Sequence, residues 1–100
     1  MTTAEIRAAL HKGLRETRPA RNVYLYPDKP FRGQDPWACA LGALGWGRGG
    51  RDARECRLLA VWLLPKELVA RTIVASKNYG RLAGVRILAR WLRARERRGE

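Results

Sequence analysis

The first apolar residues of the chain recur at helical spacing. Ile6, Leu10 and Leu14 follow one another every four residues, a period that places them on one face of an α-helix. The segment TTAE at residues 2–5 matches a capping box, in which the threonine hydroxyl accepts from the glutamate amide and the glutamate carboxylate reaches back to the cap. The pattern predicts a first helix over residues 3–16.

The pattern changes to alternation in NVYLYPDKP, at residues 22–30. Residues 23–26 predict one short extended segment, and prolines and Gly33 then mark a loop. The sequence offers this segment no partner strand, so we expect an arm packed on the surface. Tyr24 and Tyr26 occupy alternate positions that point the same way, which makes them candidates for stacking on bases.

A second helix is expected in DPWACALGALGWG, at residues 35–47. Asp35 can serve as its N-cap and Pro36 as its first helical residue, and Gly45 and Gly47 end it. The glycines that follow predict a flexible basic loop.

The segment RECRLLAVWLL is apolar almost all round from Leu58 onward, which is typical of a buried helix. Asp52 supplies an N-cap in front of it. We therefore expect the central buried helix of the fold over residues 53–64, with Leu59 and Trp62 in the core.

Pro65 ends that helix and can begin the next, PKELVARTIVASK. Asn78-Tyr79-Gly80 then signals a turn, and a last helix is expected over residues 81–97, with Trp91 bordering its packing side. That packing side is predicted to consist of Leu82, Val85, Leu88, Ala89 and Leu92.

These elements predict an all-α fold, with four to five short helices in a small bundle. One hundred residues suit a single domain with one core. We divide residues 1–100 into an N-terminal helix and extended arm (1–34), a helical core (35–97) and a flexible tail (98–100).

The charge balance is the most informative global property. The chain has 21 Lys and Arg against 9 Asp and Glu, a net charge of +12. In a small domain this excess favours a polyanionic partner, and nucleic acid is the default. The longest apolar run, residues 58–64, is too short to span a bilayer, and MTTAEIRAAL is not a secretory signal. We therefore expect a cytoplasmic protein with no membrane partner.

Residues that could perform catalysis are scarce. His11 has no serine or cysteine near it in sequence, and the aspartates suit helix caps and a turn. GWGRGGRD lacks the Lys-Ser or Lys-Thr pair of a phosphate-binding loop. Cys39 and Cys56 lack metal-ligand spacing, so we expect buried free thiols. The sequence predicts no enzyme, no cofactor and no metal site.

The last helix carries a stripe of arginines. Arg86, Arg90, Arg93 and Arg97 fall within an arc of about 60° on an ideal helix. Surface arginines of a merely stabilised helix more often alternate with acids, and Glu96 is the only acid nearby and lies off the stripe. The stripe is therefore predicted to face nucleic acid.

Helix, turn and helix across residues 66–97, preceded by an apolar helix, is the order of a three-helix DNA-reading domain. YGRLAGVRILARWLRAR resembles the turn and recognition helix of bacterial and phage helix-turn-helix regulators and of transposase-type DNA-binding domains. RECRLLAVWLL is similar to the opening of the DNA-binding domain of the bacterial replication initiator. The resemblance covers about residues 54–95 and implies a helix-turn-helix-like C-terminal half and double-stranded DNA binding.

The sequence thus predicts a small DNA-binding regulator or accessory factor of a prokaryote, phage or plasmid, with DNA preferred over RNA. Trp46, in the glycine-rich loop, is a further candidate for base stacking. Two sets of contacts are expected: phosphate contacts by Arg48, Arg51, Arg54 and Arg97, and groove contacts by Lys77, Asn78, Arg81, Arg86, Arg90 and Arg93.

Two alternatives share the basic charge. One is an RNA-binding helical subunit of a ribonucleoprotein, which would read A-form shape and backbone. The other is a protein-interaction module, such as a phage-encoded inhibitor, whose basic face meets an acidic protein surface. The sequence leaves a homodimer open.

Overall fold

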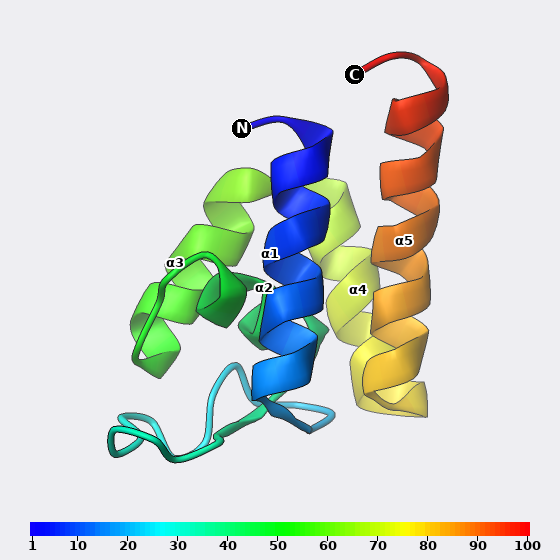
Figure 1. The fold of residues 1–100 in the computed structure, drawn as a ribbon. Helices are drawn as coiled ribbons and strands as arrows, with labels where there is room; N and C mark the ends of the chain where they lie inside the picture. Colours follow the sequence, from blue (N-terminus) through cyan, green and yellow to red (C-terminus); the bar gives the residue numbers. More distant parts are fainter.

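A computed structural model describes residues 1–100 and shows a mostly helical fold with five helices and one very small parallel sheet (Figure 1). The expectation of helices is confirmed, and the first and last helices begin and end where the sequence predicts. The elements in chain order are α1 (Thr3–Glu16), β1 (Arg18–Pro19), β2 (Trp37–Ala38), α2 (Ala40–Gly47), α3 (Ala53–Leu63), α4 (Lys66–Tyr79) and α5 (Arg81–Arg97).

Local capping signals explain where several helices begin. Thr2 and Glu5 form the capping box of α1, with the Glu5 amide donating to the Thr2 hydroxyl at 3.1 Å. Asp52 caps α3 by accepting from the Glu55 amide at 2.8 Å. Gly80 joins α4 to α5 with a φ of +97°, a conformation that glycine adopts without steric cost.

The start of α2 corrects the sequence prediction. Asp35 and Pro36 do not begin the helix, because the next residue, Trp37, belongs to β2. Trp37 exchanges two backbone hydrogen bonds with Tyr26, of 2.6 and 2.8 Å, and β2 pairs with β1 in parallel. The helix therefore starts later, with Cys39 as its N-cap. The extended arm also has partners, contrary to expectation.

The centre of the molecule is α2, a short helix of small residues. All its residues from Ala40 to Gly45 are buried. Glycines allow the neighbouring backbones to touch it: a Cβ on Gly13 of α1 would lie 1.6 Å from the Ala43 carbonyl oxygen, and one on Gly47 1.7 Å from that of Ala9. Thus α1 packs on α2 backbone to backbone.

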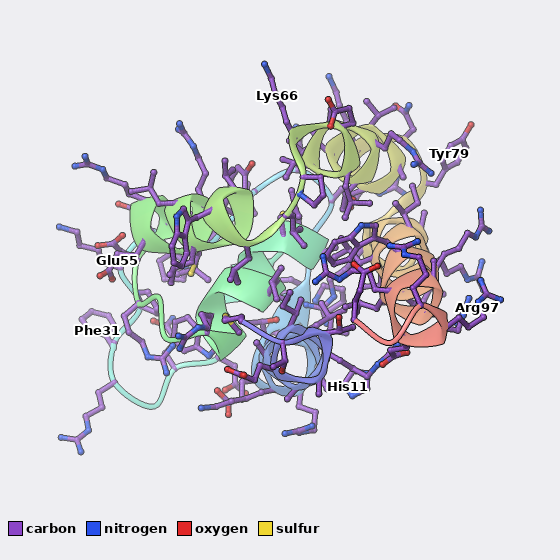
Figure 2. All side chains as sticks on the ribbon, turned by 90° about the horizontal axis from the view of Figure 1, so that it is seen from above. His11, Phe31, Glu55, Lys66, Tyr79 and Arg97 are labelled. Carbon is purple, nitrogen blue, oxygen red and sulfur yellow. The ribbon has the colours of Figure 1, made fainter.

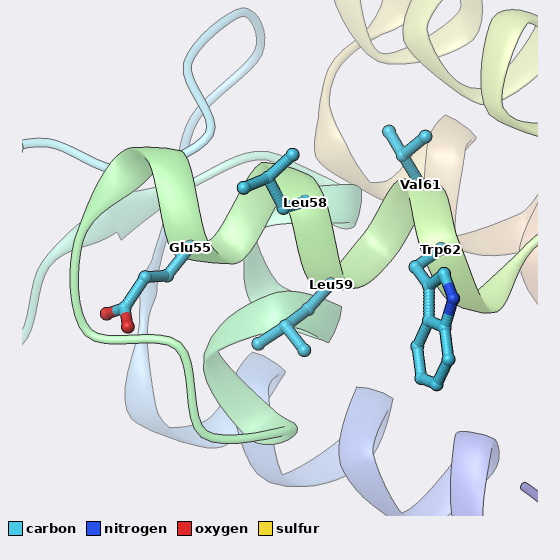
Figure 3. A pocket seen from close by; sticks show the side chains of 5 residues that line it. All are labelled: Glu55, Leu58, Leu59, Val61 and Trp62. Carbon is cyan, nitrogen blue, oxygen red and sulfur yellow. The ribbon is translucent and has the colours of Figure 1, made fainter.

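The prediction that α3 is the central buried helix is wrong. Trp62 is 79% exposed and Leu58 50% exposed, whereas only Cys56 and Ala60 of this helix are buried. Because α2 occupies the centre, α3 packs against it through one face. An open hollow on the surface, shown in Figure 3, is lined by Leu58, Leu59, Val61 and Trp62.

Helices α4 and α5 lie side by side and run in opposite directions (Figure 1). Leu88 and Leu92 are the large buried side chains of α5, and Gly84 lets α5 approach Ser76 of α4. Leu82, expected on the packing side, is 60% exposed instead. No helix of the chain combines the length and apolar composition that crossing a lipid bilayer requires.

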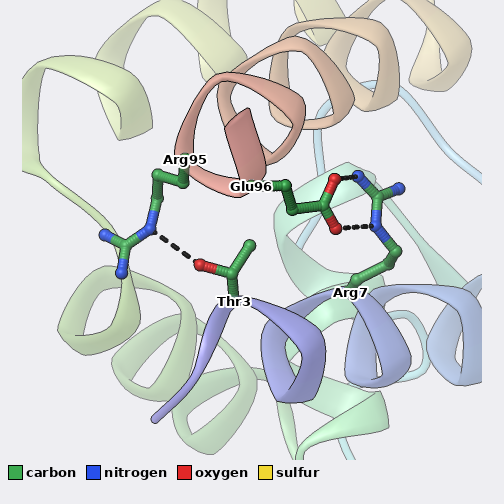
Figure 4. Close-up of polar contacts among 4 residues, drawn as sticks. All are labelled: Thr3, Arg7, Arg95 and Glu96. Atoms are coloured by element: carbon green, nitrogen blue, oxygen red, sulfur yellow. Dashed lines mark hydrogen bonds and ion pairs between the residues drawn. The ribbon is translucent and has the colours of Figure 1, made fainter. Parts of the chain in front are cut away.

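Two polar contacts fasten the C-terminal part of α5 to α1 (Figure 4). The Arg7 guanidinium donates to both carboxylate oxygens of Glu96, at 2.9 and 2.8 Å. Arg95 Nε donates to the Thr3 hydroxyl at 3.1 Å. The orientation of α5 about its own axis is therefore fixed by contacts at its end as well as by its buried leucines.

The expectation of buried free thiols is confirmed. Cys39 and Cys56 are both free and buried. Burial raises the pKa of the Cys56 thiol to about 12 and also raises the pKa of Cys39. Both thiols therefore remain protonated near neutral pH, and they behave as small apolar groups of the core.

Candidate nucleic-acid interface

The outer face of α5 carries a line of free cations. All four arginines of the predicted stripe are exposed, and they lie on the side of the helix that points away from Leu88 and Leu92. We call this surface the arginine face; it consists of Arg86, Arg90, Arg93 and Arg97. At 1.5 Å per residue it is about 16 Å long.

No arginine of the arginine face forms an ion pair. The two ion pairs of the molecule are Arg7 with Glu96 and Arg98 with Glu100. Glu96, the acid nearest the stripe, binds Arg7 of α1, and the hydrogen bond from Arg7 lowers the pKa of its carboxyl group. Glu96 is therefore ionised and bound to Arg7. The charge of Arg93 also lowers the pKa of Glu96, but none of the four arginines forms an ion pair.

Arg81 does not belong to this face, which corrects its assignment to groove contact. Its guanidinium points inward and donates to the Thr17 hydroxyl at 2.8 Å and to the Thr17 carbonyl at 3.2 Å. It also reaches the carbonyls of Leu14 and Ala38, each at 3.3 Å. Burial lowers its pKa. Arg81 thus satisfies carbonyls left without partners where α1 ends, and it holds α5 against α1 and β2.

The arginines predicted around the glycine-rich loop lie elsewhere. Arg54 is exposed at the N-terminal end of α3, beside the labelled Glu55 and across the molecule from Arg97 (Figure 2). Arg48 donates to the Met1 sulfur at 3.0 Å. Arg51 donates to the Trp46 carbonyl at 2.9 Å. The structure therefore does not bring all the predicted phosphate contacts onto one surface.

The aromatic candidates for base stacking also separate. The Trp46 ring is covered by the Arg51 guanidinium, whose carbon lies 4.2 Å from the ring centroid, and its Nε1 donates to Glu16 at 3.0 Å. Tyr24 is half-buried while Tyr26 is exposed, so the two tyrosines do not present a common face. Trp46 is thus held by contacts within the chain.

Lys77 and Asn78 are exposed at the C-terminal end of α4, close to the turn into α5. Their neighbour Tyr79 projects from this end of the helical hairpin on the α5 side of the molecule (Figure 2). Lys77 and Asn78 therefore belong to the same helical hairpin as the arginine face, but they lie on α4, whereas the arginine face lies on α5.

Three residues that orient or adjoin this surface were missed from the sequence. The end of α5 is fixed by contacts of Arg7 with Glu96 and of Thr3 with Arg95. These pairs join opposite ends of the chain, so no local sequence pattern predicts them. No cluster of three or more His, Cys, Asp or Glu side chains is arranged to hold a metal ion.

Comparison of the chain with protein-family models, with curated proteins and with solved structures gives no match. The surface chemistry of the molecule is therefore what points to its function.

Proposed function

We propose that this protein binds nucleic acid through the arginine face of α5, as a non-catalytic regulator or accessory factor of a prokaryote, phage or plasmid. Double-stranded DNA is the preferred ligand. The observation that carries the proposal is the line of four exposed arginines on one helix face, none of which has an acidic partner.

The dimensions of the arginine face suit a DNA duplex. Its length of about 16 Å corresponds to roughly five base-pair steps of 3.4 Å. The major groove of B-DNA admits an α-helix, and α5 lies at one side of the bundle with its outer face free (Figure 1). Arginine also binds phosphates and guanine edges through two parallel hydrogen bonds, which supports a role for these side chains in particular.

The order α4, Gly80, α5 is also that of a helix-turn-helix pair, but α4 and α5 run antiparallel instead of crossing at the steep angle of that motif. The proposal therefore depends on the arginines of α5. Within this proposal Arg86, Arg90 and Arg93 contact the groove, together with Lys77 and Asn78. Arg97 contacts phosphate at the end of the helix, and Arg48, Arg51 and Arg54 contribute further phosphate contacts on a separate surface.

A competition experiment at physiological salt tests the choice of ligand. A labelled 20-base-pair DNA duplex is bound to the protein and displaced with unlabelled duplex DNA or structured RNA of the same length. The proposal expects duplex DNA to displace the probe at the lowest concentration. If the RNA competes better, the ribonucleoprotein alternative replaces it.

Single substitutions test base reading. If Arg90 and Arg93 reach base edges, Arg90→Ala or Arg93→Ala should cost about 1–3 kcal/mol on a preferred sequence and much less on a random one. Arg97→Ala should weaken all sequences alike and flatten the salt dependence by about one log–log unit. Both results are measured by fluorescence anisotropy on two duplexes.

A second candidate function, protein interaction, is favoured by a different observation. Leu58, Val61 and Trp62 on α3 leave an apolar face in water (Figure 3), and such faces are common at contacts between proteins. Sedimentation of the parent and of Trp62→Ala tests whether this face forms a homodimer. A dimer that dissociates in the variant would support it, and a monomer throughout would exclude self-association through α3.

A further inference from the structure

The small sheet below α1 places two aromatic rings and a cation in one row. Trp37 pairs with Arg18 in the parallel ladder and with Tyr26 through an antiparallel bridge. Residues directly opposite each other in paired strands project their side chains to the same side. Arg18, Trp37 and Tyr26 therefore lie side by side on one face of the sheet; we call them the aromatic row.

The aromatic row is open to solvent. Tyr26 is 64% exposed and Trp37 42% exposed, and Arg18 is exposed as well. The Arg18 guanidinium carbon lies 5.6 Å from the centroid of the Trp37 ring, within the range of a cation–π contact. The fold thus holds two flat rings beside a positive charge without using the rings to fill its core.

A groove next to the row is lined by polar groups as well. Its volume is about 620 Å³, and the aromatic row lines it together with Gln34 and Asp35. Gln34 Oε1 accepts from the Phe31 amide at 3.0 Å, so the Gln34 amide hydrogens remain free to donate. The Asp35 carboxylate can accept. The groove therefore offers flat apolar faces, one donor and one acceptor.

We propose that the aromatic row binds unpaired bases of single-stranded nucleic acid. Base faces stack on exposed aromatic rings whatever their sequence, and Gln34 and Asp35 can meet the hydrogen-bonding edge of a stacked base. Arg18 supplies a charge for the neighbouring phosphate. The inference extends the proposed function, and rests on it for the chemical identity of the ligand as nucleic acid.

The charge of the surrounding chain selects between two ligands that use aromatic grooves. Proline-rich peptides also dock on exposed tryptophan and tyrosine. Here the arm between β1 and β2 carries Arg21, Lys29 and Arg32 beside Arg18, against Asp28 and Asp35. In a molecule of net charge +12, this excess favours a polyanionic strand.

The aromatic row and the arginine face are separate surfaces. Phe31, farther along the arm, lies on the opposite side of the molecule from Arg97 (Figure 2), but β1 and β2 adjoin the N-terminal end of α5, where Arg81 bonds Thr17 and Ala38. The row belongs to β1, β2 and the arm, and the arginine face belongs to α5. The proposal therefore places an unpaired segment on the row next to a paired segment on α5, as at a junction between duplex and single strand.

Anisotropy with a labelled 12-nucleotide oligothymidylate tests the inference. Trp37→Leu and Tyr26→Leu keep apolar bulk on the sheet but remove the rings, and each should weaken binding by roughly 5- to 100-fold. Trp62→Leu, which removes an exposed tryptophan from α3, is the matched control and should bind like the parent. If the circular dichroism spectrum shows that Trp37→Leu does not fold like the parent, Trp37→Phe is measured in its place. Its affinity for oligothymidylate should lie between that of the parent and that of Tyr26→Leu.

Two outcomes overturn the inference. One is that the folded variants bind oligothymidylate as tightly as the parent. The other is that a proline-rich decapeptide binds the parent and is lost in the same variants, while oligothymidylate does not bind; the row would then be a peptide site.

The same assay separates this inference from the proposed function. A variant in which all four residues of the arginine face are glutamine should lose the duplex and keep most of its oligothymidylate binding. If that variant binds the duplex normally while Trp37→Leu loses oligothymidylate, the proposed role of α5 is wrong and the aromatic row stands. If only the α5 variant shows an effect, the aromatic row is wrong and the role of α5 stands.

Discussion

Helices α2 and α3 are both rich in apolar residues, yet they occupy opposite positions in the fold. Buried α2 consists of alanine, glycine and two leucines with one tryptophan, whereas α3 carries larger apolar side chains and leaves many of them in water. Helix α3 also carries three charged residues, Arg54, Glu55 and Arg57, whereas α2 carries none. The difference shows that residue size, as well as polarity, decides which helix other elements can surround.

The reason is the distance at which backbones can pack. The Cβ atoms missing at Gly13, Gly42 and Gly47 would each overlap a carbonyl oxygen of a neighbouring segment at 1.6 to 1.7 Å. Thus α1 and the arm contact the α2 backbone directly. A helix with the side chains of α3 could not be enclosed so closely, because its leucines and tryptophan would hold its neighbours apart.

Truncating a leucine of α2 is expected to have the largest effect on stability. Leu44 is 1% exposed and belongs to the main core cluster. Leu44→Ala should therefore lower the free energy of unfolding by about 2–5 kcal/mol, because the cavity cannot fill completely. Urea denaturation measures the change. Leu58→Ala on α3 is the control, and an equal loss in both variants would contradict the difference between the helices.

Adding a single methyl group between α1 and α2 should come next. In an open helix, Gly→Ala stabilises by up to about 1 kcal/mol. Gly13→Ala should instead destabilise by about 1–3 kcal/mol, because the new Cβ meets the Ala43 carbonyl and the backbones must separate. Ala8→Gly, at an exposed position of α1, measures the difference in helix propensity between alanine and glycine without a change in helix packing. A more stable Gly13→Ala protein would show that the two helices are not in backbone contact.

The smallest effect is expected where the sequence predicted a large one. Trp62→Ala should change the free energy of unfolding by no more than about 0.5 kcal/mol, since the side chain is 79% exposed. Thermal unfolding with and without the substitution is sufficient. A loss of several kcal/mol would restore α3 as the core helix of the fold.

Local signals predicted much of this fold, and long-range pairing accounts for the errors. Thr2, Asp52 and Gly80 determine helix ends through contacts within a few residues, so their roles could be read from the sequence. The start of α2 depends instead on Trp37 pairing with Tyr26 and with β1. The burial of α2 depends on three segments meeting there, which no single stretch of sequence contains.

In the candidate site, too, local features were predicted from the sequence and features that depend on long-range contacts were not. The arginine face follows from helical period alone, and its exposure agrees with the sequence prediction. Arg81 lies on the same helix, but its position next to the end of α1 turns its guanidinium inward. The sequence suggested Tyr26 for base stacking, but the aromatic row as a whole could not be foreseen, because it exists only when β1, β2 and the arm are paired.

We propose that the arginine face binds nucleic acid because of its position, beyond its contribution to net charge. The most direct measurement compares two variants with the same net charge. In one variant the four residues of the arginine face are replaced by glutamine. In the other, four exposed cations on α1, α3 and α4 are replaced by glutamine. The second set is Lys12, Arg15, Arg57 and Arg71.

Both variants and the parent are titrated with a 20-base-pair duplex by anisotropy over a range of salt concentrations. The arginine-face variant should bind at least about tenfold more weakly at physiological salt, with a log–log salt slope less steep by about 1–4 units. The second variant should retain the affinity of the parent within about threefold. Equal losses in the two variants would contradict the claim and leave only non-specific attraction between a basic protein and DNA.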